Sequence, residues 1–339
     1  MTESTVDISM VYANNQSSIT FPMEVWDTDT ATLTRKYYLA ETETTNAAMA
    51  AVLQWAYDNG KFNPAVGDHN GLDVNTAKHG GQRLLDLDDP DCRVNYEGSG
   101  SFSAKLGFEN HPVTNVTWYG AVMFCNWLTE MRDGNTNNVV YTGITTNWDD
   151  DDTTENAAQN GYRLPSNTEW EFAARYRGSD STNTVNSYTN PYYTNGNSAS
   201  GATTYHQDNS SGSGEPGKTA NDAVAVYGSY WDAGGWVPTG TIDEAAVKSA
   251  GPNTLGLYDM SGNVWEWCFD KSGSTWRNSR GGSWYNSAAD LRTGTHGGGS
   301  NPETDGGIKG FRLYRTRQYV LSCLWEPSQI ERLISPTPF

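Results

Sequence analysis

Apolar residues recur with a helical period in three segments of the chain, and we expect helices at about 45–59, 117–132 and 167–177. Thr117 is a typical N-cap for the second helix, and Gly134 is typical of a helix end. The apolar face of this helix would consist of Trp118, Ala121, Val122, Cys125 and Leu128. These positions predict a helix that packs against the core.

The third predicted helix begins with a capping box, the sequence Ser166-Asn167-Thr168-Glu169. In this pattern, the Ser and Glu side chains each accept a hydrogen bond from the other's backbone N–H. Gly60 and Gly178 are expected to end the first and third helices. All three helices are interpreted as packing elements.

The rest of the sequence favours short strands and loops. Segments 36–40, 263–268 and 283–284 are typical of strands, and alternation places Trp265 and Trp267 on one face. Residues 178–249 are rich in Ser, Asn, Gly, Thr and Tyr, which predicts a long excursion that is ordered only where other segments hold it.

No linker divides the chain, so we expect one domain. Residues 36–316 would form its body, residues 1–35 would be an N-terminal strand region of the same domain, and residues 317–339 would be a tail. Within the body, two recognisable ends, RGGSW at 280–284 and GFRL at 310–313, enclose small polar residues without periodicity. This middle part is predicted to be a surface loop, where binding residues concentrate.

Composition indicates a folded protein with many turns. The 339 residues are 36% hydrophobic and include 13 Trp, 19 Tyr and 35 Gly. Because aromatic side chains bury a large area each, the core is expected to rely on a few large residues.

The formal net charge is −18, from 40 acidic and 22 basic residues. Binding to nucleic acid or to an anionic membrane needs clustered Lys and Arg, so both are disfavoured. No run approaches the roughly 18 apolar residues of a membrane helix. The first residues lack the pattern of an export signal, which we expect to be absent from this sequence.

The four cysteines, Cys92, Cys125, Cys268 and Cys323, are widely spaced and form no CxxC pair. This spacing predicts neither a disulfide framework nor a zinc site. Cys125 and Cys268 lie in apolar surroundings, where a buried thiol packs as a small hydrophobic group. A single disulfide bridge is the alternative.

Six segments, in order, resemble the formylglycine-generating-enzyme (sulfatase-modifying factor) family. They are AETETTN at 40–46, HPVTNVTW at 111–118, YRLPS with EWE at 162–171, GLYDMSGNVWEW at 256–267, RGGSW at 280–284 and GFR at 310–312. The resemblance covers about 36–316. It implies an α+β, C-type-lectin-like fold with small twisted antiparallel sheets, flanking helices and long loops.

The family's oxidases carry two cysteines after the RGGS motif that bind copper, and a copper(I) site needs such soft sulfur ligands. The matching positions in this sequence are Asn286 and Leu291. Related iron-dependent enzymes use a histidine-rich site, whereas this sequence has 5 His without helical His-x3-His spacing. We therefore expect no catalytic residues and no required cofactor.

Residues 285–309 also resemble the variable region of proteins encoded by diversity-generating retroelements, including the *Treponema* type. In those proteins, template adenines are randomised, and a diversified AAY codon never gives Lys, Glu, Gln, Met or Trp. None of these five types occurs between Tyr285 and Pro302. Glu303 and Lys309 depart from the rule and would be fixed positions. The alternative interpretation is a glycine-rich loop of low complexity.

The retroelement resemblance implies a diversified, solvent-facing surface supported by fixed Trp284, Arg292, Phe311 and Arg312. Main-chain hydrogen bonds should hold such loops, and Tyr285 is the expected anchor. The candidate ligand-binding positions are Tyr285, Ser287, Ala289, Asp290, Thr295, His296, Gly298, Asp305, Gly306 and Gly307.

The segment 259–266 resembles a calcium loop of the family. By this resemblance, Asp259 and Glu266 would supply carboxylates, and Gly262 and Val264 would supply carbonyls to a structural calcium ion. The alternative is a structural turn with Glu266 in a salt bridge. The acidic runs 86–91 and 149–152 are interpreted as solvated loops, and His111 as a structural hydrogen-bonding residue.

The sequence thus favours a non-enzymatic binding protein, monomeric and located on a bacterial or phage surface, that binds a protein or a glycan. Two alternatives stay open. One is an oxidase of the formylglycine-generating type with an altered site, and the other is an accessory family member without a variable surface.

Overall fold

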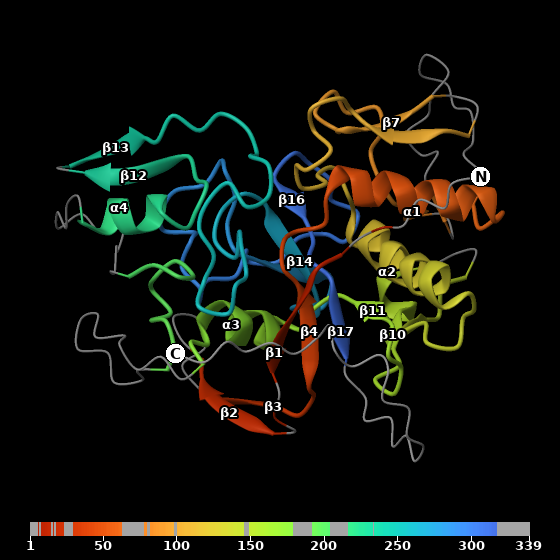
Figure 1. Ribbon diagram of the computed structural model, residues 1–339, viewed down its shortest axis with the longest axis horizontal. Helices are drawn as coiled ribbons and strands as arrows, with labels where there is room; N and C mark the ends of the chain where they lie inside the picture. Colours follow the sequence, from red (N-terminus) through yellow and green to blue (C-terminus); the bar gives the residue numbers. More distant parts are fainter. Residues whose placement is uncertain are drawn as a thin grey trace, which may run out of the picture.

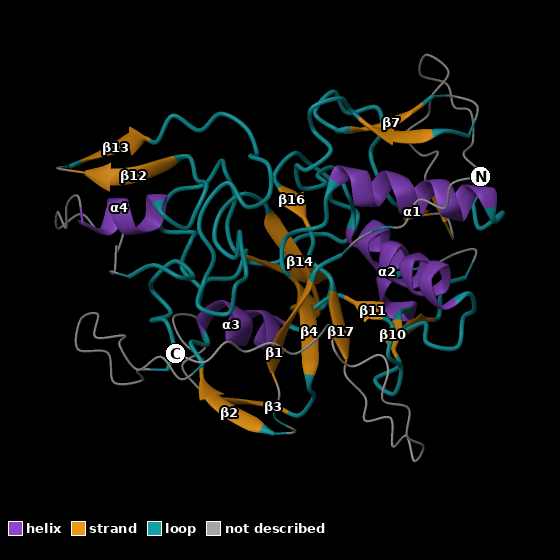
Figure 2. Cartoon of the chain, viewed as in Figure 1, coloured by secondary structure: helices purple, strands orange, loops and turns teal. Residues whose placement is uncertain are grey.

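A computed structural model of the chain shows small sheets, helices and long loops (Figures 1 and 2). It describes residue 6 and residues 8–316, apart from 15, 17, 24–29, 63–77, 80–81, 98–99, 146–148, 179–191, 204–215 and 233. The predicted tail at 317–339, which contains Cys323, lies outside the described residues. The architecture is α+β, as the sequence predicts.

Two sheets lie at the centre of the molecule (Figure 1). The larger sheet is antiparallel and has the order β1-β4-β17-β11, so it joins the beginning, middle and end of the described chain. Its strands are β1 (Met10–Asn14), β4 (Tyr37–Ala40), β17 (Tyr314–Thr316) and β11 (Tyr162–Arg163). The second sheet has the order β15-β14-β16. Its strands are β15 (Trp276–Arg280), β14 (Trp265–Ser272) and β16 (Lys309–Gly310).

The other strands form two-stranded antiparallel ribbons at the periphery. They are β2 (Ile19–Pro22) with β3 (Thr30–Leu33), β5 (Lys78–His79) with β6 (Gln82–Arg83), β7 (Val94–Tyr96) with β8 (Phe102–Ala104), β9 (Tyr141–Thr142) with β10 (Thr154–Glu155), and β12 (Ser229–Asp232) with β13 (Gly235–Pro238).

The three predicted helices are confirmed as α1 (Asn46–Asp58), α2 (Trp118–Asp133) and α3 (Asn167–Arg175). The Thr117 side chain caps α2 at Gly120 N, and Gly134 follows the helix with φ 67°. The capping box of Ser166 and Glu169 is present. Helix α4 (Pro216–Asp222) lies inside the excursion and was not predicted.

Some local predictions are wrong. Helix α3 ends at Arg175, before the expected 177, since Tyr176 has extended backbone angles. Residues Ser283 and Trp284 form a turn instead of a strand. The chain leaves β15 at Gly281 and Gly282, whose φ angles of 99° and 81° suit glycine and break the strand.

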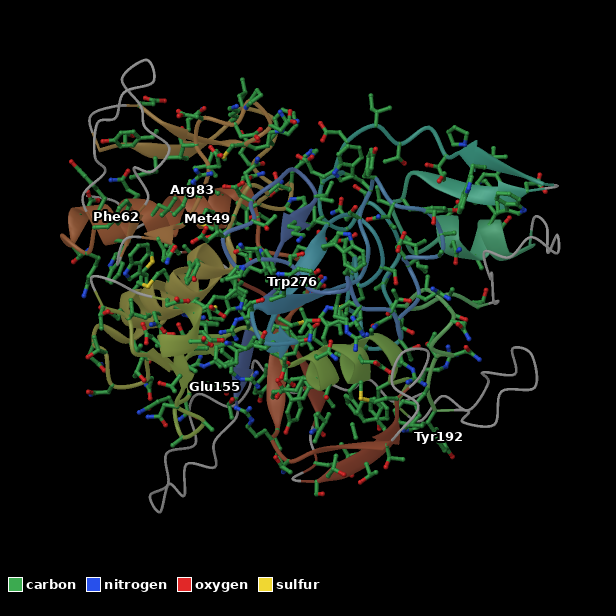
Figure 3. All side chains as sticks on the ribbon, turned by 180° about the vertical axis from the view of Figure 1, so that it is seen from behind. Met49, Phe62, Arg83, Glu155, Tyr192 and Trp276 are labelled. Atoms are coloured by element: carbon green, nitrogen blue, oxygen red, sulfur yellow. The ribbon has the colours of Figure 1, made fainter. Side chains whose placement is uncertain are left out.

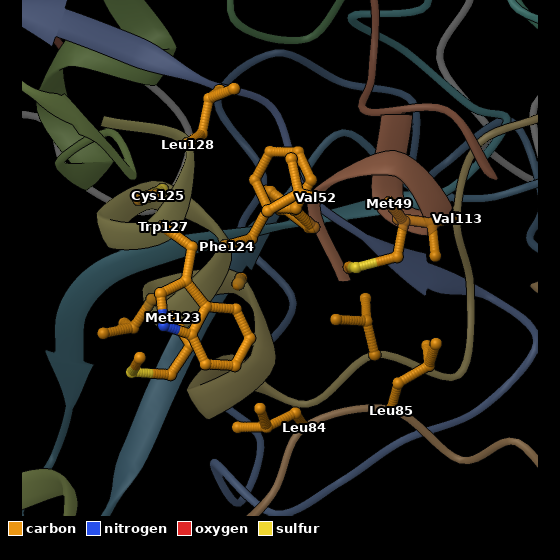
Figure 4. Packing of buried hydrophobic residues seen from close by; sticks show 14 of the residues in the cluster. Met49, Val52, Leu84, Leu85, Val113, Met123, Phe124, Cys125, Trp127 and Leu128 are labelled. Carbon is orange, nitrogen blue, oxygen red and sulfur yellow. The ribbon is translucent and has the colours of Figure 1, made fainter. Parts of the chain in front are cut away.

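Among the described residues, the core has three hydrophobic clusters. The first surrounds α1 and α2, where Met49, Val52, Phe124 and Trp127 pack together (Figure 4). The second surrounds α3, with Trp170 and Phe172 at its centre. The third is smaller and joins the excursion to residues Ala288 and Leu291. Its members from the excursion are Ala199, Ala202, Ala220, Val224, Ala225 and Tyr227.

Four arginines are among the most deeply buried side chains of the described residues, and each forms an ion pair with a buried glutamate. Most of these residues belong to the motifs that carry the family resemblance. The pairs and their N–O distances are Arg163–Glu169 at 2.7 Å, Arg175–Glu171 at 2.8 Å, Arg280–Glu171 at 3.0 Å and Arg312–Glu266 at 2.7 Å.

The Arg312–Glu266 pair connects several elements. Arg312 donates to Glu266 through Nε and Nη2, and it also donates to the carbonyls of Ala40 and Tyr258. The Trp170 indole of α3 donates to the second oxygen of Glu266 at 2.7 Å. A buried pair with these additional hydrogen bonds leaves no charge without compensation.

Replacing Arg312 by Ala should therefore strongly destabilise the fold, because Glu266 would remain buried without its cation. We expect R312A to lower the free energy of unfolding by about 3–5 kcal/mol in urea titrations. Arg315→Ala is the matched control, because Arg315 is only partly buried and its Nε donates to the Asn160 carbonyl. It should cost about 1 kcal/mol or less. Equal losses in the two variants would contradict this account.

Candidate ligand-binding surface

Residues 285–309 follow an irregular path that is held by main-chain hydrogen bonds, as predicted for a loop with variable side chains. Its first half bonds to the excursion and to β15. The bonds run from Gly228 N to Asn286 O, Ala288 N to Ser229 O, Thr293 N to Ser198 O, Gly294 N to Gly196 O and Gly297 N to Ser279 O, all between 2.8 and 3.0 Å.

The second half of the segment bonds to β15 and to the approach to α2. Ser300 and Arg277 exchange two backbone hydrogen bonds. The bonds to the approach run from Trp118 N to Pro302 O at 3.0 Å and from Asn115 N to Gly306 O at 3.1 Å. Main-chain bonds thus hold much of the path of the backbone.

Two tryptophan indoles donate hydrogen bonds to residues of the segment 285–309. The Trp284 indole donates to the Gly307 carbonyl at 3.0 Å, and the Trp265 indole donates to Asn286 Oδ1 at 2.8 Å. Gly297 packs closely against the Trp265 ring, since a Cβ at this position would lie 3.4 Å from it. Trp265 therefore supports the segment near 286 and 297, and Trp284 supports it near 307.

Most of the candidate positions are accessible. Tyr285 is 71% exposed and Gly298 is exposed. The partly exposed candidates are Ser287, Ala289, Asp290, His296, Asp305, Gly306 and Gly307. Asp305 forms an ion pair with Arg83 at 2.6 Å, so it has a structural partner as well.

Thr295 is a correction, because its side chain is only 4% exposed and does not face solvent. The carbonyls of Thr293 and Thr295 both accept hydrogen bonds from Arg280 Nη1 at 3.2 Å. This contact draws the backbone against the buried guanidinium and encloses the Thr295 side chain. Without the contact to Arg280, the Thr295 side chain would be expected to face solvent.

The expected supporting residues have structural partners. Phe311 is fully buried, and its ring meets Phe124 of α2 edge to face at 5.1 Å. Arg292 Nε donates to the Ala289 carbonyl at 2.6 Å. Gly282 allows close approach of the chain, since a Cβ would lie 2.8 Å from the Asp290 carbonyl oxygen.

The positions that match the oxidase cysteines have structural roles. The Asn286 amide oxygen accepts hydrogen bonds from the Trp265 indole and the Ser283 hydroxyl. Leu291 is 1% exposed in the third hydrophobic cluster. Neither side chain is a ligand for copper(I).

The cysteines of the described residues do not replace that site. Cys92, Cys125 and Cys268 are buried and unpaired, as predicted for Cys125 and Cys268. Burial raises the pKa of the Cys92 thiol to about 11 and the pKa values of Cys125 and Cys268 well above the usual value. Thiolates, which bind metals, are therefore disfavoured at these positions.

The residues of the expected calcium loop do not fit a calcium ion in this arrangement. The carboxylate of Glu266 is engaged by Arg312 and Trp170. Asp259 accepts a hydrogen bond from Lys248 N, and burial raises the Asp259 pKa to about 6. Within the described part of the chain, no group of three or more His, Cys, Asp or Glu side chains is arranged to hold a metal ion.

The geometry instead matches the alternative of a structural turn. Asp259 and Asn263 both have φ 57°, and Glu43 accepts hydrogen bonds from Val264 N and the Asn263 amide. Burial and the neighbouring Asp259 and Glu266 raise the Glu43 pKa well above its usual value. Gly262 is enclosed, since a Cβ would lie 2.1 Å from the Val226 carbonyl oxygen.

The sequence also singled out His111 and the acidic runs 86–91 and 149–152, and the structure confirms only some of these predictions. His111 is a structural residue, with Nδ1 3.1 Å from the Glu244 carbonyl oxygen. The acidic run at 149–152 is not a wholly solvated loop, because Asp150 is 6% exposed and bonds to Arg277 Nε at 3.0 Å. In the other run, Asp86 forms an ion pair with Arg83.

The hairpin of β12 and β13 was missed by the sequence interpretation. It lies against α4 at one side of the molecule, away from α1 and α2 (Figure 1). Its segment SYWDAGGWVP has two Gly between aromatic residues, a pattern that signals a β-hairpin. The surrounding polar composition concealed that signal.

Comparison with known proteins now identifies the family. Residues 13–317 match the sulfatase-modifying factor enzyme 1-like domain. The chain belongs to this family. Among the described residues, no helix is both long enough and apolar enough to cross a membrane.

Several curated proteins match parts of this sulfatase-modifying factor chain. The chaperone protein LppX of *Paenibacillus barcinonensis* is 34% identical over 206 residues, covering 53% of this chain and 61% of that protein. The formylglycine-generating enzyme of *Thermomonospora curvata* is 28% identical over 167 residues, covering 49% and 36%. The serine/threonine-protein kinase pkn1 of *Chlamydia pneumoniae* is 26% identical, covering 63% and 25%. Each match spans less than two thirds of the relative's length.

Two solved structures share the fold of this family member. *Treponema denticola* variable protein 1 has a TM-score of 0.55 and 22% identity, covering 94% of this chain and 98% of that chain. The structure of CarF has a TM-score of 0.57 and 22% identity, covering 92% and 99%. The predicted α+β, C-type-lectin-like fold of the formylglycine-generating type is confirmed.

Removing divalent cations should leave this sulfatase-modifying factor domain intact, because Arg312 already supplies the positive charge beside Glu266. We expect the melting temperature to change by less than about 1 °C when EDTA replaces millimolar calcium. A calcium ion bound at 100 times its Kd would instead raise the free energy of unfolding by about 2.7 kcal/mol. Thermal unfolding by circular dichroism measures the effect. A calcium-dependent rise of several degrees would contradict the structural-turn interpretation.

Proposed function

We propose that this protein is a non-enzymatic binding protein whose ligand contacts the surface of residues 285–309, and that this surface is diversified by a retroelement. The observation that carries the proposal is the separation of roles in the segment. Main-chain bonds fix its path, while Tyr285, Ser287, Ala289 and Asp290 remain accessible. Such a loop can exchange exposed side chains without losing its backbone contacts.

The residue alphabet supports the same proposal. The types that a diversified AAY codon cannot produce are absent from 285–302, and the departures at Glu303 and Lys309 lie near the end of the segment. Lys309 belongs to β16 and its side chain lies 4.6 Å from the Trp267 ring centre, which suits a fixed position. The likeness to a variable protein in fold is consistent with this use of the scaffold.

The alternative is an oxidase of the formylglycine-generating type. Asn286 and Leu291 oppose it, because their side chains complete a hydrogen-bond network and a hydrophobic cluster instead of a thiolate pair. Copper-dependent conversion of a cysteine-bearing peptide by the purified protein would establish this alternative. We expect no formylglycine to form.

The proposed ligand is a protein or a glycan, and the proposed setting is a bacterial or phage surface. A monomer is sufficient, because the candidate positions lie in one segment supported by one chain. The expected absence of a required cofactor is part of the same proposal.

The genomic locus tests diversification directly. We expect a neighbouring reverse-transcriptase gene and a near-copy of the segment encoding 284–310 that differs at template adenines. The differences should fall at codons of accessible residues such as Tyr285 and Ala289, and should spare Ala288 and Leu291, which are buried. Absence of the reverse transcriptase or the near-copy would overturn the proposal.

The neighbouring residues Ala288 and Ala289 test whether accessible positions of the segment tolerate substitution better than buried ones. Ala289 is partly exposed, so Ala289→Asn, a residue that a diversified codon produces, should change the free energy of unfolding by about 0.5 kcal/mol or less. Ala288 is 1% exposed, so Ala288→Asn should cost about 2 kcal/mol or more by overpacking and by burying an amide. Urea unfolding measures both. A large loss from Ala289→Asn would show that this position is structural.

A further inference from the structure

The hairpin of β12 and β13 presents two tryptophans beside the candidate surface. Trp231 and Trp236 are directly paired across the strands, and their rings meet at 5.4 Å with an interplanar angle of 87°. Trp236 is 52% exposed, and Pro238 on the same face is exposed too. A large apolar ring held open to solvent on a rigid hairpin is typical of a binding anchor.

Residues 286–288 run along the free edge of β12. Ser229 and Ser287 form a parallel bridge, and hydrogen bonds join Gly228 N to Asn286 O and Ala288 N to Ser229 O. Since residues paired across strands project to the same face, Ser287 shares the face of Trp231 and Trp236. The tryptophans and the variable segment therefore belong to one continuous surface.

The opposite face of the hairpin is occupied. Tyr230 packs against the third hydrophobic cluster, and the Lys218 ammonium of α4 lies 5.1 Å from its ring centre. The alternation of side chains along β12 then turns Trp231 away from that cluster. Figure 1 shows α4 next to the hairpin, with the two strands at the edge of the molecule.

The exposed face has no formal charge, although the protein carries −18. Asp232 is the charged residue of the segment 229–238, and it projects to the occupied face because it is adjacent to Trp231. The accessible candidate residues beside the hairpin are Tyr285, Ser287 and Ala289, which also carry no charge. Aromatic rings next to a hydroxyl group complement a sugar, whose C–H face packs on a ring and whose hydroxyls form hydrogen bonds.

Trp231 adds a second feature of a polar ligand site. Its indole N–H is buried and has no acceptor among the residues that the structure describes. A buried donor without a partner is costly. A ligand hydroxyl that reaches this N–H would supply the acceptor.

We propose that the Trp231–Trp236 face of the hairpin is the fixed wall of the ligand site and that the site binds a neutral glycan. Trp236 stacks on a sugar ring, and the neighbouring Tyr285 and Ser287 select among sugars. This proposal rests on the proposed function, since it names the ligand class of the same surface.

The experiment titrates the full chain with neutral glucan, mannan, galactan and N-acetylglucosamine oligomers, and follows tryptophan fluorescence and calorimetry. We expect saturable binding of at least one series. Trp236→Ala should weaken it at least tenfold. Trp276→Ala is the matched control, with 51% exposure and a position away from the hairpin (Figure 3), and it should stay within twofold. Circular dichroism confirms that each variant is folded.

The outcomes separate this inference from the proposed function. Failure of every neutral series at millimolar concentration would overturn the glycan assignment, as would equal losses in the two tryptophan variants. Loss in Tyr285→Ala or Ser287→Ala with full binding in Trp236→Ala would overturn the hairpin wall and support the variable surface. Loss in Trp236→Ala alone would support the wall and contradict the role of the variable residues.

Discussion

The ion pair of Arg312 with Glu266, buried completely, is the interaction on which the rest of the structure depends. The Arg312 guanidinium connects Glu266 of β14 to the carbonyl of Ala40, at the end of β4, and to the carbonyl of Tyr258. The Trp170 indole of α3 donates a hydrogen bond to the same carboxylate. Because removing either charge would leave the other buried, this junction tolerates few substitutions. Glu266 and Arg312 lie in the motifs WEW and GFR, which carry part of the family resemblance.

A second buried ion pair holds the neighbouring loop mainly through its main chain. Arg280, paired with Glu171, fixes the chain immediately before the loop and also bonds to the carbonyls of Thr293 and Thr295 within it. The loop is thus attached through carbonyl oxygens, which every residue type possesses. Under the proposed function, exposed positions such as Tyr285 then serve recognition, because the loop does not need them to hold its path.

The sequence predicted what depends on local pattern or on a complete family motif. The caps at Thr117 and Ser166 and the apolar face of α2 are local, so their helices were found correctly. The burial of Asp150 was misjudged because it depends on Arg277, which lies far away in the sequence. The burial of Thr295 was misjudged because it depends on a contact with Arg280 across the loop. Helix α4 and the β12–β13 hairpin were missed because their neighbours are polar, and their ordering comes from packing against Ala288 and Leu291.

The same long-range packing involves Asn286 and Leu291, the positions that match the cysteines of the oxidases. Leu291 closes the cluster that holds the excursion, and Asn286 accepts the Trp265 indole while its carbonyl accepts Gly228 N. A cysteine at either position would lose one of these contacts, since a thiol is a weak acceptor and smaller than leucine. The hairpin beside the loop therefore depends on residues that the oxidases use for copper. In this chain, the side chains at 286 and 291 therefore support both the loop and the packing of the excursion beside it.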